Sequence, residues 1–249
     1  MRLLVANPNT TDAVTALVAE AAGRAASPGT QIFGVSARFG PAIIGTRAEL
    51  AIAEHAALEV LVRHSGGCDA AIVAASTDSG LRAARELLPM PVLGLTESAL
   101  HVACLLGGRF VALTLSARSA VFARELIEGY GLLGRCAGVR SVPVTPEALL
   151  AEPATAARLL AEQALAAVED GADTVVLVGA VLADMAARLQ PEMPVPVVEG
   201  VSCAVGLAEM VVRLNIPPAR AGSYAQPGGR PSIGLDPVLA ARLAWKGIE

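Results

Sequence analysis

The stretch Asp69-Ala-Ala-Ile-Val-Ala-Ala75 decides the fold of this chain, because a similar stretch follows 104 residues later as Asp173-Thr-Val-Val-Leu-Val-Gly179. Both are unbroken apolar runs, which are typical of β-strands that helices cover on both faces. The opening Arg2-Leu-Leu-Val-Ala-Asn7 matches Arg109-Phe-Val-Ala-Leu-Thr114 in the same way, at an offset of 107. We therefore expect two half-domains related by duplication.

Short apolar runs alternate with longer Ala-rich runs along the rest of the chain, and this alternation predicts parallel sheets with helices on both faces. The predicted strands are 3–6, 31–35, 70–74, 92–95, 110–113, 139–144, 174–178 and 195–198. The predicted helices are roughly 10–25, 47–65, 79–88, 98–107, 119–130, 146–170, 183–190 and 200–214. The sequence thus predicts an α/β fold of two pseudo-symmetric, flavodoxin-like half-domains with one interdomain cleft. The first half-domain takes residues 1–95 and about 200–249, and the second takes residues 96–199.

The composition limits the classes of protein to which the chain can belong. Of its 249 residues, 54% are hydrophobic and 17% are charged, which favours a substantial core over disorder. The net charge of −4 and the absence of a basic run argue against nucleic acid as a partner. No apolar run reaches 18 residues and no signal-peptide pattern opens the chain, so we expect no membrane association and a cytoplasmic location.

Residue types that commonly hold cofactors or metals are rare or scattered. The only lysine, Lys246, is the fourth residue from the end, which argues against a Schiff base or a lysine-bound pyridoxal cofactor. The four cysteines, Cys68, Cys104, Cys136 and Cys203, form no C-x-x-C pair, so neither a zinc site nor a disulfide framework is indicated. We expect no cofactor, no metal, and core packing as the role of the thiols.

Polar turns follow the predicted strand ends, where ligands bind in open parallel sheets. Four such turns stand at 7–10, 75–80, 114–116 and 179–181. Their hydroxyls and backbone N–H groups would suit a carboxylate, an imide oxygen or a developing enolate. The predicted substrate-binding residues are Asn9, Ala75, Ser76, Thr77, Thr114, Gly179 and Ala180. Helix capping is the alternative role for the polar residues among them.

The turn Asn7-Pro8-Asn9-Thr10 resembles the N-P-N-T opening of the hydantoin racemases. Other stretches that share the resemblance are Phe39-Gly-Pro-Ala42, Pro91-Val-Leu-Gly-Leu-Thr-Glu97 and Arg135-Cys-Ala-Gly-Val-Arg140. Together they extend over nearly the whole chain. The chain therefore resembles the hydantoin and allantoin racemases of the aspartate/glutamate racemase superfamily. That superfamily also includes arylmalonate decarboxylases and maleate isomerases, and its members use no cofactor.

In that family two cysteines flank the substrate carbon, where one removes the α-proton as a thiolate and the other returns a proton to the opposite face. The resemblance places the first cysteine at Ala75, within a pattern like C-x-x-D-P-G-L, and the second at Gly179, within a G-C-A-G-M-like turn. Neither alanine nor glycine can carry a proton. The resemblance thus implies that two-cysteine racemisation does not run in this chain.

We expect a cofactor-independent isomerase or lyase that acts on a small carboxylate or a cyclic imide or ureide through an enolate-like intermediate. Asp78 and Glu199 are the candidate catalytic residues, because a dry cleft can raise the pKa of a carboxyl group toward neutrality. Two alternatives stay open: a non-catalytic binding protein, and a cyclase or hydrolase that uses a cleft carboxylate. The resemblance also implies a homo-oligomer.

Overall fold

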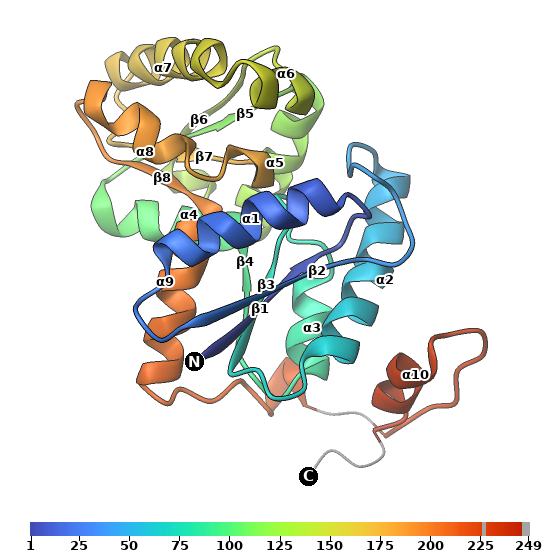
Figure 1. Ribbon diagram of the computed structural model, residues 1–249. Coiled ribbons are helices and arrows are strands. Elements are labelled where there is room, and N and C mark those ends of the chain that lie inside the picture. The colour runs from blue at the N-terminus through green and yellow to red at the C-terminus, as the bar shows by residue number, and fades with distance from the viewer. Residues whose placement is uncertain (226–227, 246–249) are drawn as a thin grey trace. The chain divides into compact units, whose positions relative to one another are not determined.

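A computed structural model describes residues 1–225 and 228–245 and divides the chain into two compact units (Figure 1). Unit 1 consists of Met1–Ala74, Asp78–Leu93 and Val205–Glu249, and unit 2 consists of Ala75–Thr77 and Gly94–Ala204. Lys246 lies outside the described residues. Across the described ranges, no helix combines the length and the apolar character that crossing a bilayer requires.

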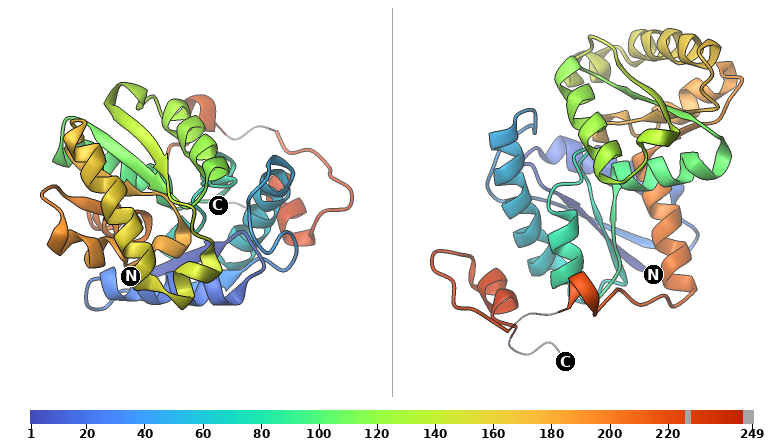
Figure 2. Two further views of the ribbon diagram at one scale, coloured as in Figure 1. Left: turned by 90° about the horizontal axis from the view of Figure 1, so that it is seen from above. Right: turned by 180° about the vertical axis from the view of Figure 1, so that it is seen from behind.

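Unit 1 is built on a four-stranded sheet in the order β2-β1-β3-β4. Its strands are β1 (Arg2–Asn7), β2 (Gln31–Ser36), β3 (Ala70–Val73) and β4 (Val92–Gly94). Its helices are α1 (Asp12–Ala25), α2 (Arg47–His64), α3 (Leu81–Leu87) and α10 (Pro237–Leu243). Apolar side chains of β1 and β3 pack against α2 and α3 on one face of the sheet. Figures 1 and 2 show α1 over the opposite face.

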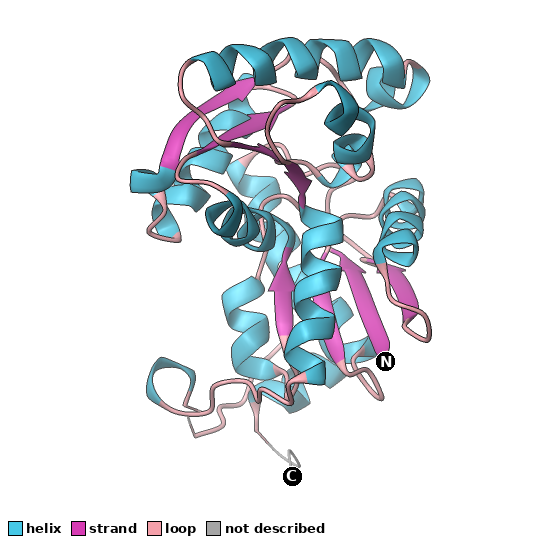
Figure 3. Ribbon diagram, turned by 90° about the vertical axis from the view of Figure 1, so that its left-hand side faces the viewer, coloured by secondary structure: helices cyan, strands magenta, loops and turns pink. Residues whose placement is uncertain are grey.

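Unit 2 repeats this design with a sheet in the order β6-β5-β7-β8 (Figure 3). Its strands are β5 (Phe110–Thr114), β6 (Cys136–Ser141), β7 (Thr174–Leu177) and β8 (Val197–Glu199). Its helices are α4 (Leu95–Leu106), α5 (Ala117–Gly129), α6 (Pro146–Ala151), α7 (Pro153–Glu169) and α8 (Met185–Leu189). Alternate residues of β5 point to α4 and α5 on one face and to α7 on the other. The boundary between the units falls within α9 (Gly200–Arg213).

The two sheets match in strand order and also in register. Just before β3, the carboxylate of Asp69 accepts a hydrogen bond from the backbone N–H of Arg2, at 2.7 Å. Just before β7, the carboxylate of Asp173 accepts the same bond from Arg109, at 2.8 Å. The sequence repeat therefore corresponds to a structural repeat, and the prediction of two pseudo-symmetric α/β half-domains is confirmed.

Several element boundaries differ from the sequence prediction. The helix expected over 146–170 is two helices, because Pro153 lacks the N–H that a continuous helix needs. β6 begins at Cys136, three residues before the predicted start, so Cys136 belongs to a strand. α4 begins directly after β4, at Leu95, which shortens the connection between them.

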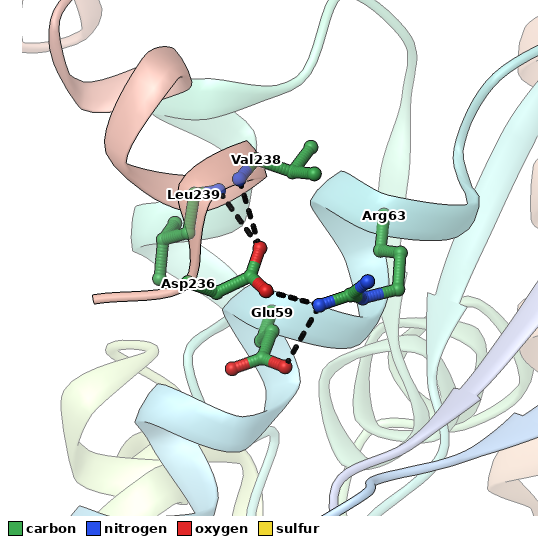
Figure 4. Close-up of polar contacts among 5 residues, drawn as sticks. All are labelled: Glu59, Arg63, Asp236, Val238 and Leu239. Carbon is green, nitrogen blue, oxygen red and sulfur yellow. Dashed lines mark hydrogen bonds and ion pairs between the residues drawn. The ribbon is translucent and has the colours of Figure 1, made fainter. Parts of the chain in front are cut away.

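The sequence prediction missed helix α10, which packs against α2 (Figure 4). The carboxylate of Asp236 caps α10 by accepting hydrogen bonds from the N–H groups of Val238 and Leu239, at 2.9 and 3.4 Å. The same carboxylate forms an ion pair with Arg63 of α2, which also contacts Glu59 at 3.4 Å. Leu239 is buried in the core beneath α2. The sequence carried a signal for this helix, since Asp followed by Pro is a favoured start.

Candidate functional site

Ala75 and Gly179 each follow the third strand of a sheet by two residues. In unit 1 the N–H of Ala74 donates to the carbonyl of Ala6 at 2.8 Å. In unit 2 the N–H of Val178 donates to the carbonyl of Leu113, also at 2.8 Å. Since the preceding residues have the same partners in the two sheets, Ala75 and Gly179 stand at equivalent positions, as the sequence repeat predicts.

The segment Ala75–Thr77 belongs with unit 2, where the start of α4 holds it. The hydroxyl of Thr96 donates to the carbonyl of Ser76 at 2.7 Å. Ala75 is buried, whereas Ser76 and Thr77 are half-buried, so the two hydroxyl residues lie nearer the surface than the alanine. The sequence analysis did not single out Thr96. Its position one residue into the helix that follows β4 was the available signal.

The turn after β7 has an extended backbone at Gly179, with φ of 168°, which any residue can adopt. The carbonyl of Gly179 accepts from the N–H of Leu182 at 3.0 Å, which closes the 3₁₀ turn Ala180–Leu182. A Cβ at position 179 would lie 3.0 Å from Leu182 Cδ1, the end of a flexible side chain. Leu182 is fully buried, so a side chain larger than glycine fits at position 179 only if Leu182 shifts by a few tenths of an ångström.

Thr114 and Glu199 end the strands on either side of β7, at the same edge of the sheet. Thr114 is buried, and its carbonyl accepts the N–H of Val142 at 2.9 Å. Glu199 is 2% exposed, and its two carboxylate oxygens accept the N–H groups of Val201 and Ser202 at 2.6 and 2.7 Å. Both oxygens of Glu199 thus cap α9, a use that the sequence analysis did not foresee for this residue.

Gly200 follows Glu199 and lies against the first residue of α4. A Cβ built on Gly200 would lie 2.7 Å from Leu95 Cβ and 2.8 Å from the Leu95 carbonyl oxygen. No side chain fits at that distance unless the backbone moves, so only glycine allows β8 and α4 to meet in this way.

Asn9 and Asp78 belong to unit 1. Asn9 is 9% exposed and lies in the turn after β1, where its Oδ1 accepts the N–H of Thr11 at 2.9 Å. Asp78 is 6% exposed and has a left-handed backbone, with φ of 46°. Its carbonyl accepts the N–H of Leu81 at 3.1 Å, so Asp78 forms part of the turn that starts α3.

The four cysteines are half-buried and pack against apolar clusters. Burial, followed by the charge of Glu199, raises the pKa of Cys203 from 9.0 to about 12. Burial is also the main cause that raises the pKa of Cys68 and of Cys136. These three thiols are therefore protonated at neutral pH, and a protonated thiol is a poor base.

The predicted site residues thus fall into two groups. Unit 2 holds seven of them at the carboxyl ends of its strands or in the attached turn: Ala75, Ser76, Thr77, Thr114, Gly179, Ala180 and Glu199. Unit 1 holds Asn9 and Asp78. That both groups serve one ligand stays a prediction. Among the described residues, no three His, Cys, Asp or Glu side chains are grouped so that they could hold a metal ion.

Comparisons with known proteins give consistent matches over the chain. A family model described as Asp/Glu/hydantoin racemase matches residues 3–208. The hydantoin racemase of Pseudomonas sp. (strain NS671) is 33% identical over 236 residues, which cover 94% of this chain and 95% of that protein. The structure of an allantoin racemase from Klebsiella pneumoniae is 34% identical and has a TM-score of 0.88, covering 96% of this chain and 98% of that one. The allantoin racemase from Pseudomonas fluorescens is 33% identical with a TM-score of 0.89, over 94% and 100% of the two chains.

Proposed function

This chain belongs to the Asp/Glu/hydantoin racemase family, and from that premise we propose that it is an isomerase or lyase that works without the two-cysteine mechanism. Its proposed substrate is a small carboxylate or a cyclic imide or ureide whose α-carbon can lose a proton or a carboxyl group. The observation that carries the proposal is the equivalence of Ala75 and Gly179, both small, at the positions where the family resemblance places the cysteines.

The proposed reaction passes through an enolate-like intermediate. The C–H or C–C bond at the α-carbon breaks, and its electron pair moves onto the neighbouring carbonyl oxygen. Hydrogen-bond donors that point at that oxygen stabilise it, typically by about 3–4 kcal/mol for a well-placed donor. The Asn9 amide and the hydroxyls of Ser76, Thr77 and Thr114 are the proposed donors. A proton then adds to the carbon, and the cycle needs no external electrons.

Asp78 is the carboxylate we propose to test first as the proton-transfer group. It is buried at the start of α3, where access of water is reduced. Glu199 is the second candidate, although capping of α9 already engages both of its oxygens. The small side chain of Ala75 would admit a bulkier group on the substrate, whereas Leu182 already lies close to where a Cβ of residue 179 would be.

A second candidate function is binding of such a ligand without turnover. The observation that favours it is the chemistry of the three residues named above: Ala75 and Gly179 have no titratable group, and Glu199 is committed to helix capping. Under this proposal the chain would keep the fold and the donors of a racemase and would act as a sensor or carrier.

Incubation with allantoin, hydantoins and α-substituted malonates in D₂O tests these proposals. NMR would detect deuterium at the α-carbon, release of CO₂ or ring opening, and calorimetry would detect binding. Exchange or CO₂ release that falls at least tenfold in Asp78→Asn supports the enolate proposal with Asp78 as the proton-transfer group. Glu199→Gln tests the second carboxylate in the same way, and Glu192→Gln is the control because Glu192 is exposed.

Each result selects one function. Binding without any chemical change would support the carrier, and ring opening alone would support a hydrolase. Neither binding nor turnover with any of these compounds would contradict the proposed substrate class. Homo-oligomerisation is a separate proposal that light scattering can check on the same preparation.

A further inference from the structure

We infer that a directional chain of hydrogen bonds in unit 1 fixes the side-chain amide of Asn9 so that its Nδ2 donors are left for a ligand. Asp12, Thr15 and Ser36 would then be positioning residues that act through Asn7 on Asn9. The inference deepens the proposed function and rests on it, because this chain of hydrogen bonds can affect ligand binding only if Asn9 faces the ligand.

Two backbone N–H groups set the orientation of the amides. The N–H of Asn9 donates to Asn7 Oδ1 at 3.1 Å, and the N–H of Thr11 donates to Asn9 Oδ1 at 2.9 Å. A backbone N–H cannot accept, so the side-chain atom that faces it has to be oxygen in both cases. Asn7 Nδ2 then donates to Asn9 Oδ1 at 2.9 Å. Asn9 Oδ1 therefore accepts two hydrogen bonds, which is the usual capacity of an amide oxygen.

The second proton of Asn7 Nδ2 starts a series of hydrogen bonds that connects residues of α1 and β2. Asn7 Nδ2 donates to Thr15 Oγ1 at 2.8 Å, and it lies at a longer distance of 3.4 Å from the carbonyl of Thr11. Thr15 Oγ1 lies 2.6 Å from Ser36 Oγ, and Ser36 donates to Asp12 Oδ1 at 2.6 Å. An ionised carboxylate can only accept hydrogen bonds, so the Ser36 hydroxyl donates its proton to Asp12. The Ser36 oxygen therefore has to accept the hydrogen bond that the Thr15 hydroxyl donates. The chain therefore runs in one direction, from Asn7 to Asp12.

Burial makes this direction hard to reverse. Asn7 is fully buried and Thr15 is 7% exposed, so a mismatched donor in the chain would have no water to pair with. A buried polar group without a partner costs about 1–3 kcal/mol. Reversal would place donor against donor at the backbone N–H of Asn9 and again at the N–H of Thr11.

The free end of the chain is Asn9 Nδ2. It has no hydrogen-bond partner among the described residues, and it is not among the buried polar atoms that lack one, so it reaches the surface of unit 1. A ligand at this point meets two N–H donors and has to offer an acceptor. A ring carbonyl, a carboxylate oxygen or an enolate oxygen fits, whereas the N–H of a ureide does not.

Side-chain amide NMR on the ligand-free protein tests the chain of hydrogen bonds directly. We expect the Asn7 Nδ2 protons to exchange slowly with solvent and the Asn9 Nδ2 protons to exchange fast. Thr15→Val keeps the shape of the side chain but removes the acceptor, so Asn7 exchange should accelerate about tenfold. Thr15→Ser should restore slow exchange. Thr11→Val is the matched control. Thr11 lies in the same turn as Asn9, but its hydroxyl donates to the carbonyl of Ala42 and takes no part in this chain of hydrogen bonds.

Equal Asn7 exchange rates in the wild type, Thr15→Val and Thr15→Ser would overturn the inference. If Thr15→Val does not fold, Thr15→Ala takes its place, since it also removes the hydroxyl that accepts from Asn7 Nδ2, and the same acceleration is expected.

Addition of allantoin as the probe tests the ligand end. We expect the Asn9 Nδ2 signals to shift, and Kd to rise about tenfold in Thr15→Val and less than about threefold in Thr15→Ser. Binding that leaves the Asn9 signals unmoved would overturn the assignment of Nδ2 as the ligand donor. Absence of binding with intact Asn7 protection would instead count against the proposed substrate class, so the two failures are distinguishable.

Discussion

Ala75 and Gly179 occupy equivalent positions in two sheets of identical strand order, each two residues beyond the end of the third strand. The residues before them, Ala74 and Val178, donate to the first strand of their own sheet at the same distance of 2.8 Å. A duplicated scaffold thus presents two matched points that differ from each other by a single methyl group.

The double variant Ala75→Cys, Gly179→Cys should gain racemisation of a hydantoin. A positioned acid or base typically accelerates proton transfer by about 10²–10⁴-fold, and racemisation needs one group on each face of the carbon. Either single variant should gain little. Chiral chromatography of the product over time measures the gain.

The matched control is the double serine variant, which has almost the same volume but no thiolate at neutral pH. If the folded cysteine pair is no faster than the serine pair, the placement of the family's cysteines at these positions is wrong.

Activity of the wild type should survive alkylation. The raised pKa of Cys68, Cys136 and Cys203 keeps these thiols protonated, and the thiolate is the form that reacts with iodoacetamide. Treatment at pH 7.5 should leave Cys203 unlabelled in peptide mass spectrometry and should leave turnover unchanged. The cysteine double variant should be inactivated under the same conditions. Loss of wild-type activity in step with labelling of any native cysteine would contradict a thiol-free mechanism.

Arg135→Gln should destabilise unit 2. The Arg135 guanidinium donates to the carbonyls of Cys104, Gly107 and Gly108 at 2.9, 2.6 and 2.6 Å, which satisfies the C-terminal end of α4. Loss of these charge-assisted bonds should lower the free energy of unfolding by about 2–3 kcal/mol, measured by urea denaturation.

Arg158→Gln is the control for Arg135→Gln. Arg158 pairs with Glu162 on the exposed side of α7, with 64% and 56% of the two side chains exposed, and such pairs contribute little. A similar loss of stability in both variants would mean that capping of α4 is not the cause.

Leu239→Ala should release α10 from α2. Leu239 is 2% exposed, and truncation of a buried leucine to alanine costs about 2–5 kcal/mol. Since α10 is a short element at the end of the chain, we expect faster proteolysis after residue 225 with little change in the unfolding of the rest. Val238→Ala, on the same helix but 42% exposed, should be cleaved like the wild type. Equal cleavage of all three proteins would show that Leu239 does not anchor α10.

Acid should weaken the contact between α9 and the loop before β2. Burial tends to raise the pKa of Glu209, but hydrogen bonds from Ser27 and Thr30 outweigh it and lower the pKa below 4.5. Because the folded pKa is the lower one, this stabilisation is present above about pH 4.5 and is lost as the pH falls through the folded value. Glu209→Gln should therefore show a smaller fall in Tm between pH 6 and pH 3 than the wild type. A fall as large as that of the wild type would rule Glu209 out as its source.

The strands were predictable from the sequence because those buried on both faces read as continuous apolar runs. All eight exist, and the sequence repeat predicted the equivalence of β1 with β5 and of β3 with β7. The break at Pro153 and the start of β6 depend on local geometry that an Ala-rich pattern does not reveal. Helix α10 was not predicted, because it is held by the burial of Leu239 and by the Arg63–Asp236 ion pair. Both contacts join segments that are far apart in the sequence.

The positions of the candidate site residues in the fold were predictable from the sequence, whereas the contacts of their side chains were not. Glu199 stands at the end of a strand, where a catalytic acid could lie, but only the structure shows that α9 engages both of its oxygens. The sequence marked Asn7 only as part of a motif. The structure shows that its side chain is buried and forms hydrogen bonds with Asn9. Hydrogen-bond direction depends on three-dimensional partners, which sequence spacing alone does not supply.

Gly200 has a consequence for any attempt to evolve this protein in the laboratory. It lies against Leu95, the first residue of α4, and the next residue of that helix, Thr96, donates a hydrogen bond to the carbonyl of Ser76. Randomised libraries can therefore sample small residues at positions 75 and 179, because Ala75 is buried and Leu182 lies close to Gly179, whereas position 200 should be held invariant. Gly200 has no reactive side chain, yet the geometry of every variant in such a library would depend on it.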